Sequence, residues 1–204
     1  MSTVLKVAVS QRVDVYPERN ERRDALEQRL SLWVAEAGYV PVPVPNLMST
    51  VQGQDWQRLQ AWLQAIRPEA VLLSGGNDIG HALERDATER RLLAYAKDRE
   101  LPVLGICRGM QMMGVWAGVA LKSVEGHVRT RHILRGDFVQ EVNSFHSHGL
   151  TECPQGFEVS VRAEDGEIEA IRNTELHWEG WMWHPERERP FQPADIDRLR
   201  RLFA

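Results

Sequence analysis

Cys107 lies between two glycines, Gly105 and Gly109, in the stretch LPVLGICRGMQ. The apolar residues 101–106 predict a buried strand, and residues 108–116 predict a helix that follows at once. A residue in so tight a turn needs small neighbours, and this spacing is that of a nucleophile elbow. A thiol at a helix N-terminus is favoured as the thiolate, the form that attacks a carbonyl carbon. A buried cysteine is more often a small core residue, so the spacing alone leaves both interpretations open.

A base and a carboxylate that could orient it stand near the end of the chain. His184 and Glu186 are two residues apart in WHPE, directly after the apolar stretch EGWMW. If a strand continues through them, both side chains point to one face. The carboxylate can then hold one imidazole nitrogen while the other faces a thiol, takes its proton and passes it to a leaving amine. The same residues also suit an ordinary surface turn.

The turn SGGND is a third candidate, because its two glycines, Gly75 and Gly76, follow the apolar run 70–73. Glycine permits unusual backbone angles and close approach of another group. A helix predicted at 87–99 joins this run to the strand before Cys107, and such a βαβ unit brings both strand ends to one edge of the sheet. Backbone N–H groups there fit an oxyanion hole. A plain tight turn is the alternative.

The elements around these motifs predict an α/β fold. In the first half we expect a strand at 4–9, a polar loop at 10–20, a helix at 21–37, an edge strand at 39–44 and a helix around Trp56 to Ile66. In the second half, turns rich in Gly, Asn and Asp separate strands expected at 138–142, 157–161, 167–172 and 179–183, and a helix at 195–203 closes the chain. This half is predicted to be largely antiparallel.

The composition bounds the class of protein. A chain of 204 residues with 43% hydrophobic residues predicts one domain, 1–204, with an ample core. The net charge of -4 gives no sign of a nucleic-acid partner, and no apolar run is long enough for a membrane span. No secretory signal is apparent, and the two cysteines, Cys107 and Cys153, make no disulfide framework, so we expect a cytoplasmic protein.

Taken together, GICRGMQ, SGGND and WHPE resemble the class I glutamine amidotransferases in order and spacing, over nearly the whole chain. The resemblance is greatest to the free-standing γ-glutamyl hydrolase branch, peptidase family C26. VNSFHSHGL, EDGEIEAI and the pattern of Gly126, His127, Arg129 and His132 resemble further segments of that branch. The opening segment resembles a sub-branch found with surface-polysaccharide biosynthesis, some of whose members cleave a γ-glutamyl nucleotide phosphoramidate.

The resemblance implies a flavodoxin-like three-layer sandwich, with a mostly parallel central sheet and an antiparallel β excursion in the C-terminal half. It implies that Cys107 is the nucleophile, His184 the general base and acid, and Glu186 its orienter. The backbone N–H groups of Gly76 and Arg108 would form the oxyanion hole. The implied substrate-binding residues are Gln111, Asn143, Ser144, Phe145 and His146. The reaction would hydrolyse a γ-glutamyl amide through a thioester, and such thiol chemistry needs no cofactor.

The sequence differs from the usual pattern of this branch at three positions, and these differences bear on which substrate is bound more than on which residues catalyse the reaction. Gly114 stands where the branch has Asn, Ala117 where it has Gly, and His148 where it has Gln. The basic residues Arg129 and Arg131 fall in a segment expected to flank the pocket. Their guanidinium forks suit an anionic leaving group, although a charge cluster is usually a solvated loop.

Three functions compete at this point. The first is a stand-alone γ-glutamyl hydrolase with a small-molecule substrate, and the second is a glutaminase subunit that delivers ammonia to a partner synthase. The third is a non-catalytic relative, against which the intact Cys, His and Glu argue. The resemblance allows a homodimer. His146 and His148 have the spacing of a metal pair, but no Cys or carboxylate stands nearby at ligand spacing, so we expect no metal.

Overall fold

The computed structural model describes residues 4–46 and 56–204. A sheet with the strand order β4-β1-β5-β6-β13-β12-β11-β8-β9 runs through them. Its first part is parallel and consists of β4 (Val40–Pro43), β1 (Lys6–Val9), β5 (Ala70–Leu73), β6 (Val103–Ile106) and β13 (Trp178–Trp181). Its second part is antiparallel and consists of β12 (Ile168–Asn173), β11 (Glu158–Arg162), β8 (Val128–Gly136) and β9 (Gln140–Phe145). The predicted α/β architecture with an antiparallel C-terminal excursion is confirmed.

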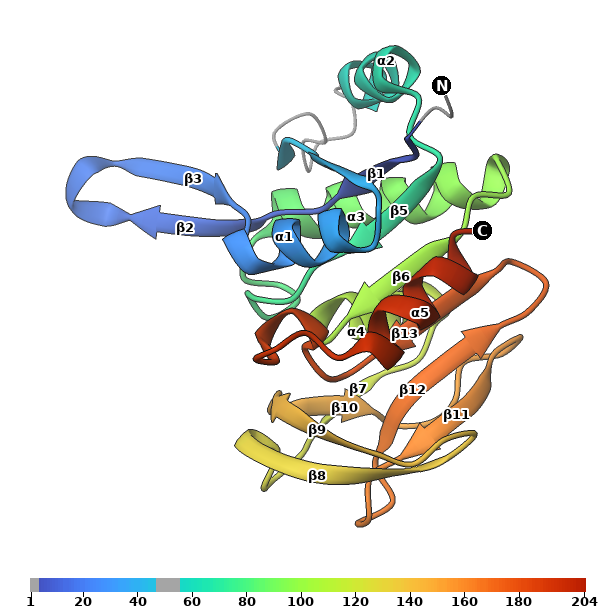
Figure 1. Cartoon of the computed structure of the whole chain (residues 1–204). Coiled ribbons are helices and arrows are strands. Elements are labelled where there is room, and N and C mark those ends of the chain that lie inside the picture. The colour runs from blue at the N-terminus through green and yellow to red at the C-terminus, as the bar shows by residue number, and fades with distance from the viewer. Residues whose placement is uncertain (1–3, 47–55) are drawn as a thin grey trace.

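Helices cover both faces of the parallel strands (Figure 1). One face carries α1 (Gln28–Glu36) and α5 (Pro193–Leu202), and the other carries α2 (Trp56–Ile66), α3 (Leu83–Asp98) and α4 (Arg108–Trp116). The alternation of side chains along β1 sets this division. Val7 and Val9 share a core with Trp33 of α1, whereas Ala8 shares one with Leu63 of α2. Within the described ranges, no helix is long and apolar enough to cross a bilayer.

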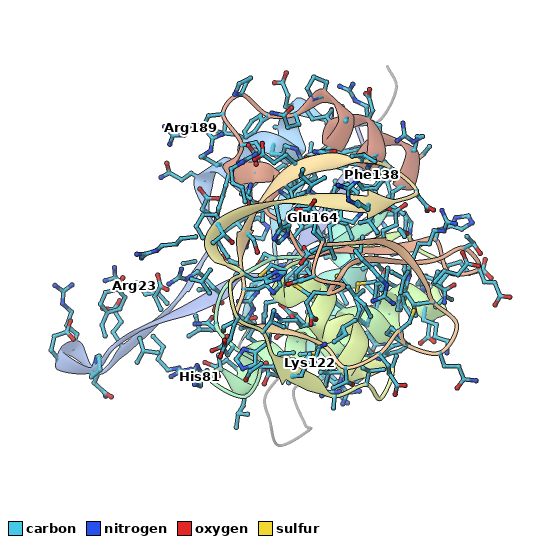
Figure 2. The ribbon with its side chains drawn as sticks, turned by 90° about the horizontal axis from the view of Figure 1, so that it is seen from below. Arg23, His81, Lys122, Phe138, Glu164 and Arg189 are labelled. Atoms are coloured by element: carbon cyan, nitrogen blue, oxygen red, sulfur yellow. The ribbon has the colours of Figure 1, made fainter. Side chains whose placement is uncertain are left out.

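The segment between β1 and α1 differs from the prediction of a polar loop followed by a helix from residue 21. It forms a hairpin of β2 (Arg12–Tyr16), the 3-10 turn η1 (Pro17–Arg19) and β3 (Glu21–Ala25). The tip of the hairpin projects from the body (Figure 1), whereas Val13 and Arg22 tie the hairpin to Asn77 and Glu84. Figure 2 shows Arg23 on the hairpin. Residues 21–25 carry no apolar stripe that a helix could bury. Asn20, with a φ of 49°, closes the turn instead and allows the two strands to pair.

The antiparallel excursion also contains strands that were not predicted. They are β8 and the two-stranded sheet of β7 (Leu121–Ser123) and β10 (His148–Leu150). The sequence of β8, VRTRHILRG, is charged, and most of its residues are exposed or half-buried. Such a strand has no clean apolar and polar alternation, and its existence depends on pairing with β9 and β11, which are distant in the sequence.

Candidate active site

Cys107 occupies the turn between β6 and α4 with a φ of 51° and a ψ of -105°. A positive φ is uncommon for a residue with a side chain, and the surrounding packing must hold it. A Cβ on Gly105 would lie 2.6 Å from the backbone carbon of Gly109. A Cβ on Gly109 would lie 2.2 Å from the carbonyl oxygen of Leu73. The predicted need for small neighbours at this turn is therefore confirmed.

Gly109→Ala is expected to destabilise the protein much more than Gly114→Ala in the same helix. Alanine at 109 drives its methyl group into the backbone of Leu73, whereas alanine at 114 meets the side-chain end of Leu150 at 2.3 Å. We expect Gly109→Ala to lower the unfolding free energy by about 3 kcal/mol and Tm by roughly 6–12 °C. Thermal unfolding of both variants checks this, and equal losses would contradict the close approach of α4 to β5.

His184 is buried beside both Cys107 and Glu186. Its Nδ1 lies 2.7 Å from Oε1 of Glu186. Because a carboxylate only accepts, Nδ1 donates its proton, which leaves Nε2 for the thiol. The ring and the Cys107 side chain border the same cavity and interact electrostatically. Burial alone would lower the pKa of His184, but the negative charges of Glu186 and Cys107 outweigh it and raise this pKa to about 10. Burial likewise acts to raise the pKa of Glu186, yet the adjacent imidazole lowers it overall.

The backbone that carries this pair is a turn and not a continued strand. β13 ends at Trp181, and Pro185 begins the 3-10 turn η3 (Pro185–Arg187). The strand argument for a shared face is wrong, because proline cannot donate to a strand ladder and here opens a turn. The turn still brings Glu186 back to the His184 ring. Asn143 fixes the histidine from β9: its Nδ2 donates to the His184 carbonyl at 2.8 Å, and its Oδ1 accepts from the His184 N–H at 3.1 Å.

A cavity of about 290 Å³ opens above Cys107, where β5, β6 and β13 end. It is lined by Gly76, Asn77, Asp78, His81, Cys107, Arg108, Gln111, Phe145, His146, Ser147, His184 and Arg187. The site therefore lies at the carboxyl edge of the parallel strands, as expected for this architecture. A larger cavity of about 470 Å³, between α5 and strands β12 and β13, contains none of the predicted site residues.

The two predicted oxyanion-hole residues both border this cavity. Gly76 has a φ of 96°, which favours glycine, and Arg108 is the first residue of α4. The first N–H groups of a helix have no partner within the helix, so that of Arg108 is free to stabilise an anion. Their role in catalysis remains a prediction, but their position beside Cys107 suits it.

The predicted substrate-binding residues divide into two groups. Gln111, Phe145 and His146 line the cavity, whereas Asn143 and Ser144 do not. The Asn143 amide is engaged by the His184 backbone, and the Ser144 hydroxyl donates to the His127 carbonyl at 2.7 Å. The structure thus gives these two residues contacts that support the site from β9, where we expected substrate contacts.

The basic residues Arg129 and Arg131 also lie apart from the cavity. Both belong to β8, and Nη1 of Arg131 pairs with Oε1 of Glu188 at 3.0 Å. Neither residue is among those that line the cavity, and Glu188, which pairs with Arg131, follows the His-Pro-Glu motif. A role of these arginines toward the substrate stays a prediction. Instead Arg187 borders the cavity and lies 4.4 Å above the Phe145 ring. An arginine directly after the His-Pro-Glu motif was the sequence signal for it.

Sequence analysis missed a buried ion network beneath the SGGND turn. Glu89 of α3 is paired with both Arg85 and Arg108, and Asp86 also pairs with Arg108. Nη2 of Arg85 donates to the carbonyls of Ser74 and Gly75 at 2.6 and 3.0 Å. Burial lowers the pKa of each arginine to about 9. The sequence did carry a signal for this network: residues 85, 86 and 89 are charged, and they lie in or just before a helix that was predicted to pack on the sheet.

The comparison with protein families agrees with this geometry. The family model named glutamine amidotransferase class-I matches residues 44–196, which is more than half of the chain. The chain belongs to the class I glutamine amidotransferases. The matched range contains the SGGND turn, the elbow at Cys107 and the pair of His184 and Glu186.

The relatives of this amidotransferase domain carry the names of two kinds of enzyme, a hydrolase and a synthase subunit. It is 30% identical over 126 residues to a gamma-glutamyl-CDP-amidate hydrolase from Campylobacter jejuni, which covers 59% of this chain and 63% of that protein. It is 33% identical over 138 residues to a glutamine-hydrolysing GMP synthase subunit from Natronomonas pharaonis, over 60% of this chain and 68% of that one. The match thus spans less than two thirds of the Campylobacter protein. A crystal structure described as a GMP synthase subunit from Thermoplasma acidophilum superposes with a TM-score of 0.73 at 17% identity, over 100% of this chain and 94% of that chain, which shows the shared fold.

Proposed function

We propose that this chain hydrolyses a γ-glutamyl amide bond, with Cys107 as the nucleophile. The observation that carries the proposal is the position of His184, which lies beside Cys107 at the wall of a cavity and is held on its other side by the Glu186 carboxylate. This is the arrangement that activates a weak nucleophile and fixes its base in one tautomer. A structural cysteine in the core needs neither partner.

In this proposal the thiolate attacks the γ-carbonyl carbon and pushes its electrons onto the carbonyl oxygen. The N–H groups of Gly76 and Arg108 stabilise that oxyanion. The His184 imidazolium then protonates the leaving amine, the C–N bond breaks, and a γ-glutamyl thioester remains on Cys107. His184, now neutral, takes a proton from water, whose oxygen attacks the thioester and releases glutamate. Glu186 keeps the imidazole oriented throughout and stabilises its charged form.

Replacing Glu186 by glutamine is expected to move the alkaline limb of the kcat/KM profile toward neutral pH. The Glu186 charge raises the pKa of His184, so its removal lowers that pKa and the imidazolium is lost at a lower pH. We also expect kcat to fall by roughly 10²-fold or more. The measurement is a pH profile of glutamate release, with the exposed Glu152→Gln as the matched control. An unchanged alkaline limb would exclude Glu186 as the orienter.

Substrate class is tested by glutamate release from the purified chain alone. It is offered glutamine, γ-glutamyl-γ-aminobutyrate and a γ-glutamyl nucleotide phosphoramidate. The similarity to the Campylobacter hydrolase favours the phosphoramidate, whose anionic leaving group could meet Arg187 at the cavity wall. Release from a conjugate but not from glutamine supports a self-contained hydrolase. Faster release from simple γ-glutamyl amines than from the phosphoramidate would contradict the nucleotide substrate.

The second candidate function is a glutaminase subunit that supplies ammonia to a separate synthase. The similarity to the Natronomonas GMP synthase subunit is the observation that favours it. Activity on glutamine alone, or activity that appears only when a partner protein is added, would support this alternative over the first.

A further inference from the structure

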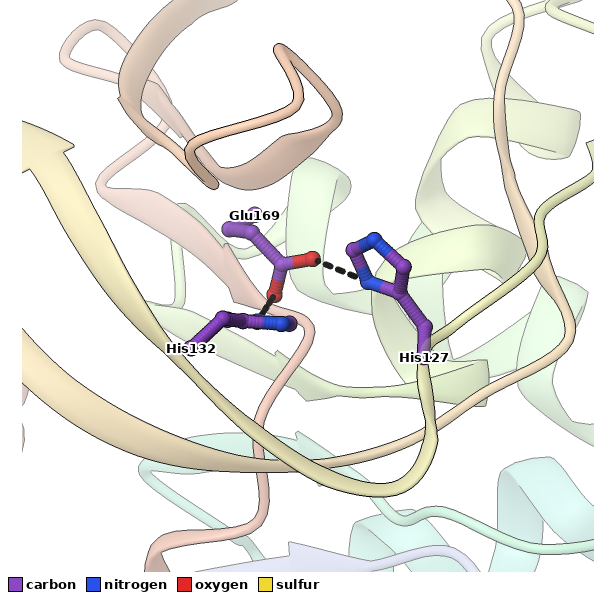
Figure 3. Close-up of side chains that lie close together, drawn as sticks. All are labelled: His127, His132 and Glu169. Carbon is purple, nitrogen blue, oxygen red and sulfur yellow. Dashed lines mark ion pairs between the residues drawn. The ribbon is translucent and has the colours of Figure 1, made fainter.

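A buried cluster of histidines and one carboxylate lies behind the cavity wall. Figure 3 shows the Glu169 carboxylate of β12 between the rings of His127 and His132. Oε1 of Glu169 is 3.2 Å from Nδ1 of His127, and Oε2 is 3.4 Å from Nε2 of His132. A third ring joins them, since Nε2 of His146 is 3.2 Å from Oε1 and 3.1 Å from Nδ1 of His127. Glu169 is fully buried.

The outer contacts of the cluster decide where its protons sit. Nε2 of His127 lies 2.7 Å from Oδ2 of Asp165, and Nδ1 of His146 lies 3.1 Å from the His148 carbonyl oxygen. Both partners only accept, so these two nitrogens carry the ring protons. In neutral rings, Nδ1 of His127 and Nε2 of His146 therefore direct lone pairs at each other and at the Glu169 carboxylate. The arrangement requires a positive charge between them.

A single added proton does not complete the cluster. It can bridge His127 and His146, but Nε2 of His132 and Oε2 of Glu169 then remain as they are, buried and without a hydrogen-bond partner among the described residues. Buried polar atoms are rarely left so, because each costs the desolvation of its group. One cation bound at the centre would satisfy all four side chains.

We propose that His127, His132, His146 and Glu169 form a binding site for a divalent metal ion of the zinc class. Three imidazoles and one carboxylate are a ligand set that such ions accept. One ligand atom from each of His127, His132 and Glu169 lies within 4.8 Å of the others. Nδ1 of His127, Nε2 of His146 and Oε1 of Glu169 lie 3.1–3.2 Å from one another, close to the separation of about 3.3 Å that a four-coordinate ion with bonds of about 2.0–2.1 Å imposes. Nε2 of His132 faces the other oxygen of the same carboxylate, Oε2, at 3.4 Å. Asp165 and the His148 carbonyl hold the outer ring nitrogens, as outer partners of metal-bound histidines do.

Four protein ligands leave no open position, so the site is structural. It ties together the segment before β8, β8 itself, the residue that follows β9, and β12. His146 lines the reaction cavity, so the ion would also hold that part of the wall in place. The expectation of no metal rested on the lack of a nearby carboxylate in the sequence. The structure supplies one from Glu169, and His148 contributes its carbonyl in place of its ring.

The test is zinc binding by the full chain after chelator dialysis, measured as bound Zn²⁺ per chain and as a shift in Tm. It is made in the Cys107→Ala variant, because the thiolate and His184 could otherwise hold Zn²⁺ themselves. We expect one equivalent of Zn²⁺ and a Tm that rises by about 5 °C or more when free Zn²⁺ is 100-fold above Kd. Co²⁺ in its place should give the visible absorption of a four-coordinate site.

Two variants separate a metal site from a proton-bridged cluster. His132→Gln keeps a hydrogen-bond donor near Glu169 but removes an imidazole ligand, and Asp165→Asn changes a half-exposed outer partner with little risk to folding. Each is expected to weaken Zn²⁺ binding roughly tenfold or more, whereas the exposed His177→Gln should not change it. The proposal is overturned if the parent chain binds no Zn²⁺, or if both variants bind it as tightly as His177→Gln does.

Discussion

Replacing Cys107 by alanine is expected to reduce glutamate release by about 10⁴-fold or more, because no other group of the cavity can form the thioester. The variant should fold, since alanine leaves the elbow glycines and the packing of α4 on β5 unchanged. Steady-state release from the best substrate of the panel, together with Tm, measures both effects. Cys107→Ser is expected to be nearly as inactive, because the hydroxyl is held far less as an anion at neutral pH.

The second cysteine provides the matched control. Cys153 is half-buried outside the cavity, and its Sγ contacts the Phe157 carbonyl at 3.3 Å. Burial raises the pKa of this thiol, which makes it a poor nucleophile. Cys153→Ala should therefore retain activity. If Cys107→Ala remains active while Cys153→Ala does not, the proposed nucleophile is wrong.

The elements nearest the proposed nucleophile were the ones that sequence predicted best. The elbow depends on local facts: an apolar strand, two glycines at fixed offsets and a helix that starts at Arg108. Parallel strand pairing through α3 then brings the SGGND turn to Cys107 by topology alone. Reasoning of this kind needs only neighbours in the sequence and the handedness of a βαβ unit.

The predictions that failed depended on contacts between segments, either in the local hairpin of β2 and β3 or between parts of the chain that are distant in sequence. Residues 21–25 lack an apolar stripe, and only their pairing with β2 shows that they form a strand. The role of Asn143 depends on the His184 backbone, which lies far along the chain. The carboxylate that faces His127 and His146 comes from β12, which reaches them through the antiparallel order of the excursion. No spacing rule within the sequence predicts such pairs.

Glu89 is the residue whose loss should destabilise this protein most through electrostatics. It is fully buried, and its Oε1 accepts from Ser10 Oγ at 2.8 Å and from Arg85 Nε at 3.0 Å. Its second oxygen pairs with Arg108. Among the described residues, Glu89→Ala leaves Arg85 without its ion pair and Arg108 with the Asp86 pair alone. Removing one member of a buried ion pair costs about 3–5 kcal/mol, because the remaining charge stays desolvated. We expect Tm to fall by roughly 10 °C or more.

The same substitution tests whether the network also positions the proposed oxyanion hole. Arg85 holds the Ser74 and Gly75 carbonyls, and Glu89 holds Arg85. Glu89→Gln keeps an acceptor and most of the packing, so it should remain folded while its weaker hold on Arg85 lowers kcat more than it changes KM.

The control for stability is the exposed Asp98→Ala at the end of α3, which should change the unfolding free energy by no more than about 0.5 kcal/mol. If Glu89→Ala is as stable as Asp98→Ala, the buried ion network does not stabilise the folded protein. If Glu89→Gln keeps full activity, the network stabilises the fold but does not position the SGGND turn for catalysis.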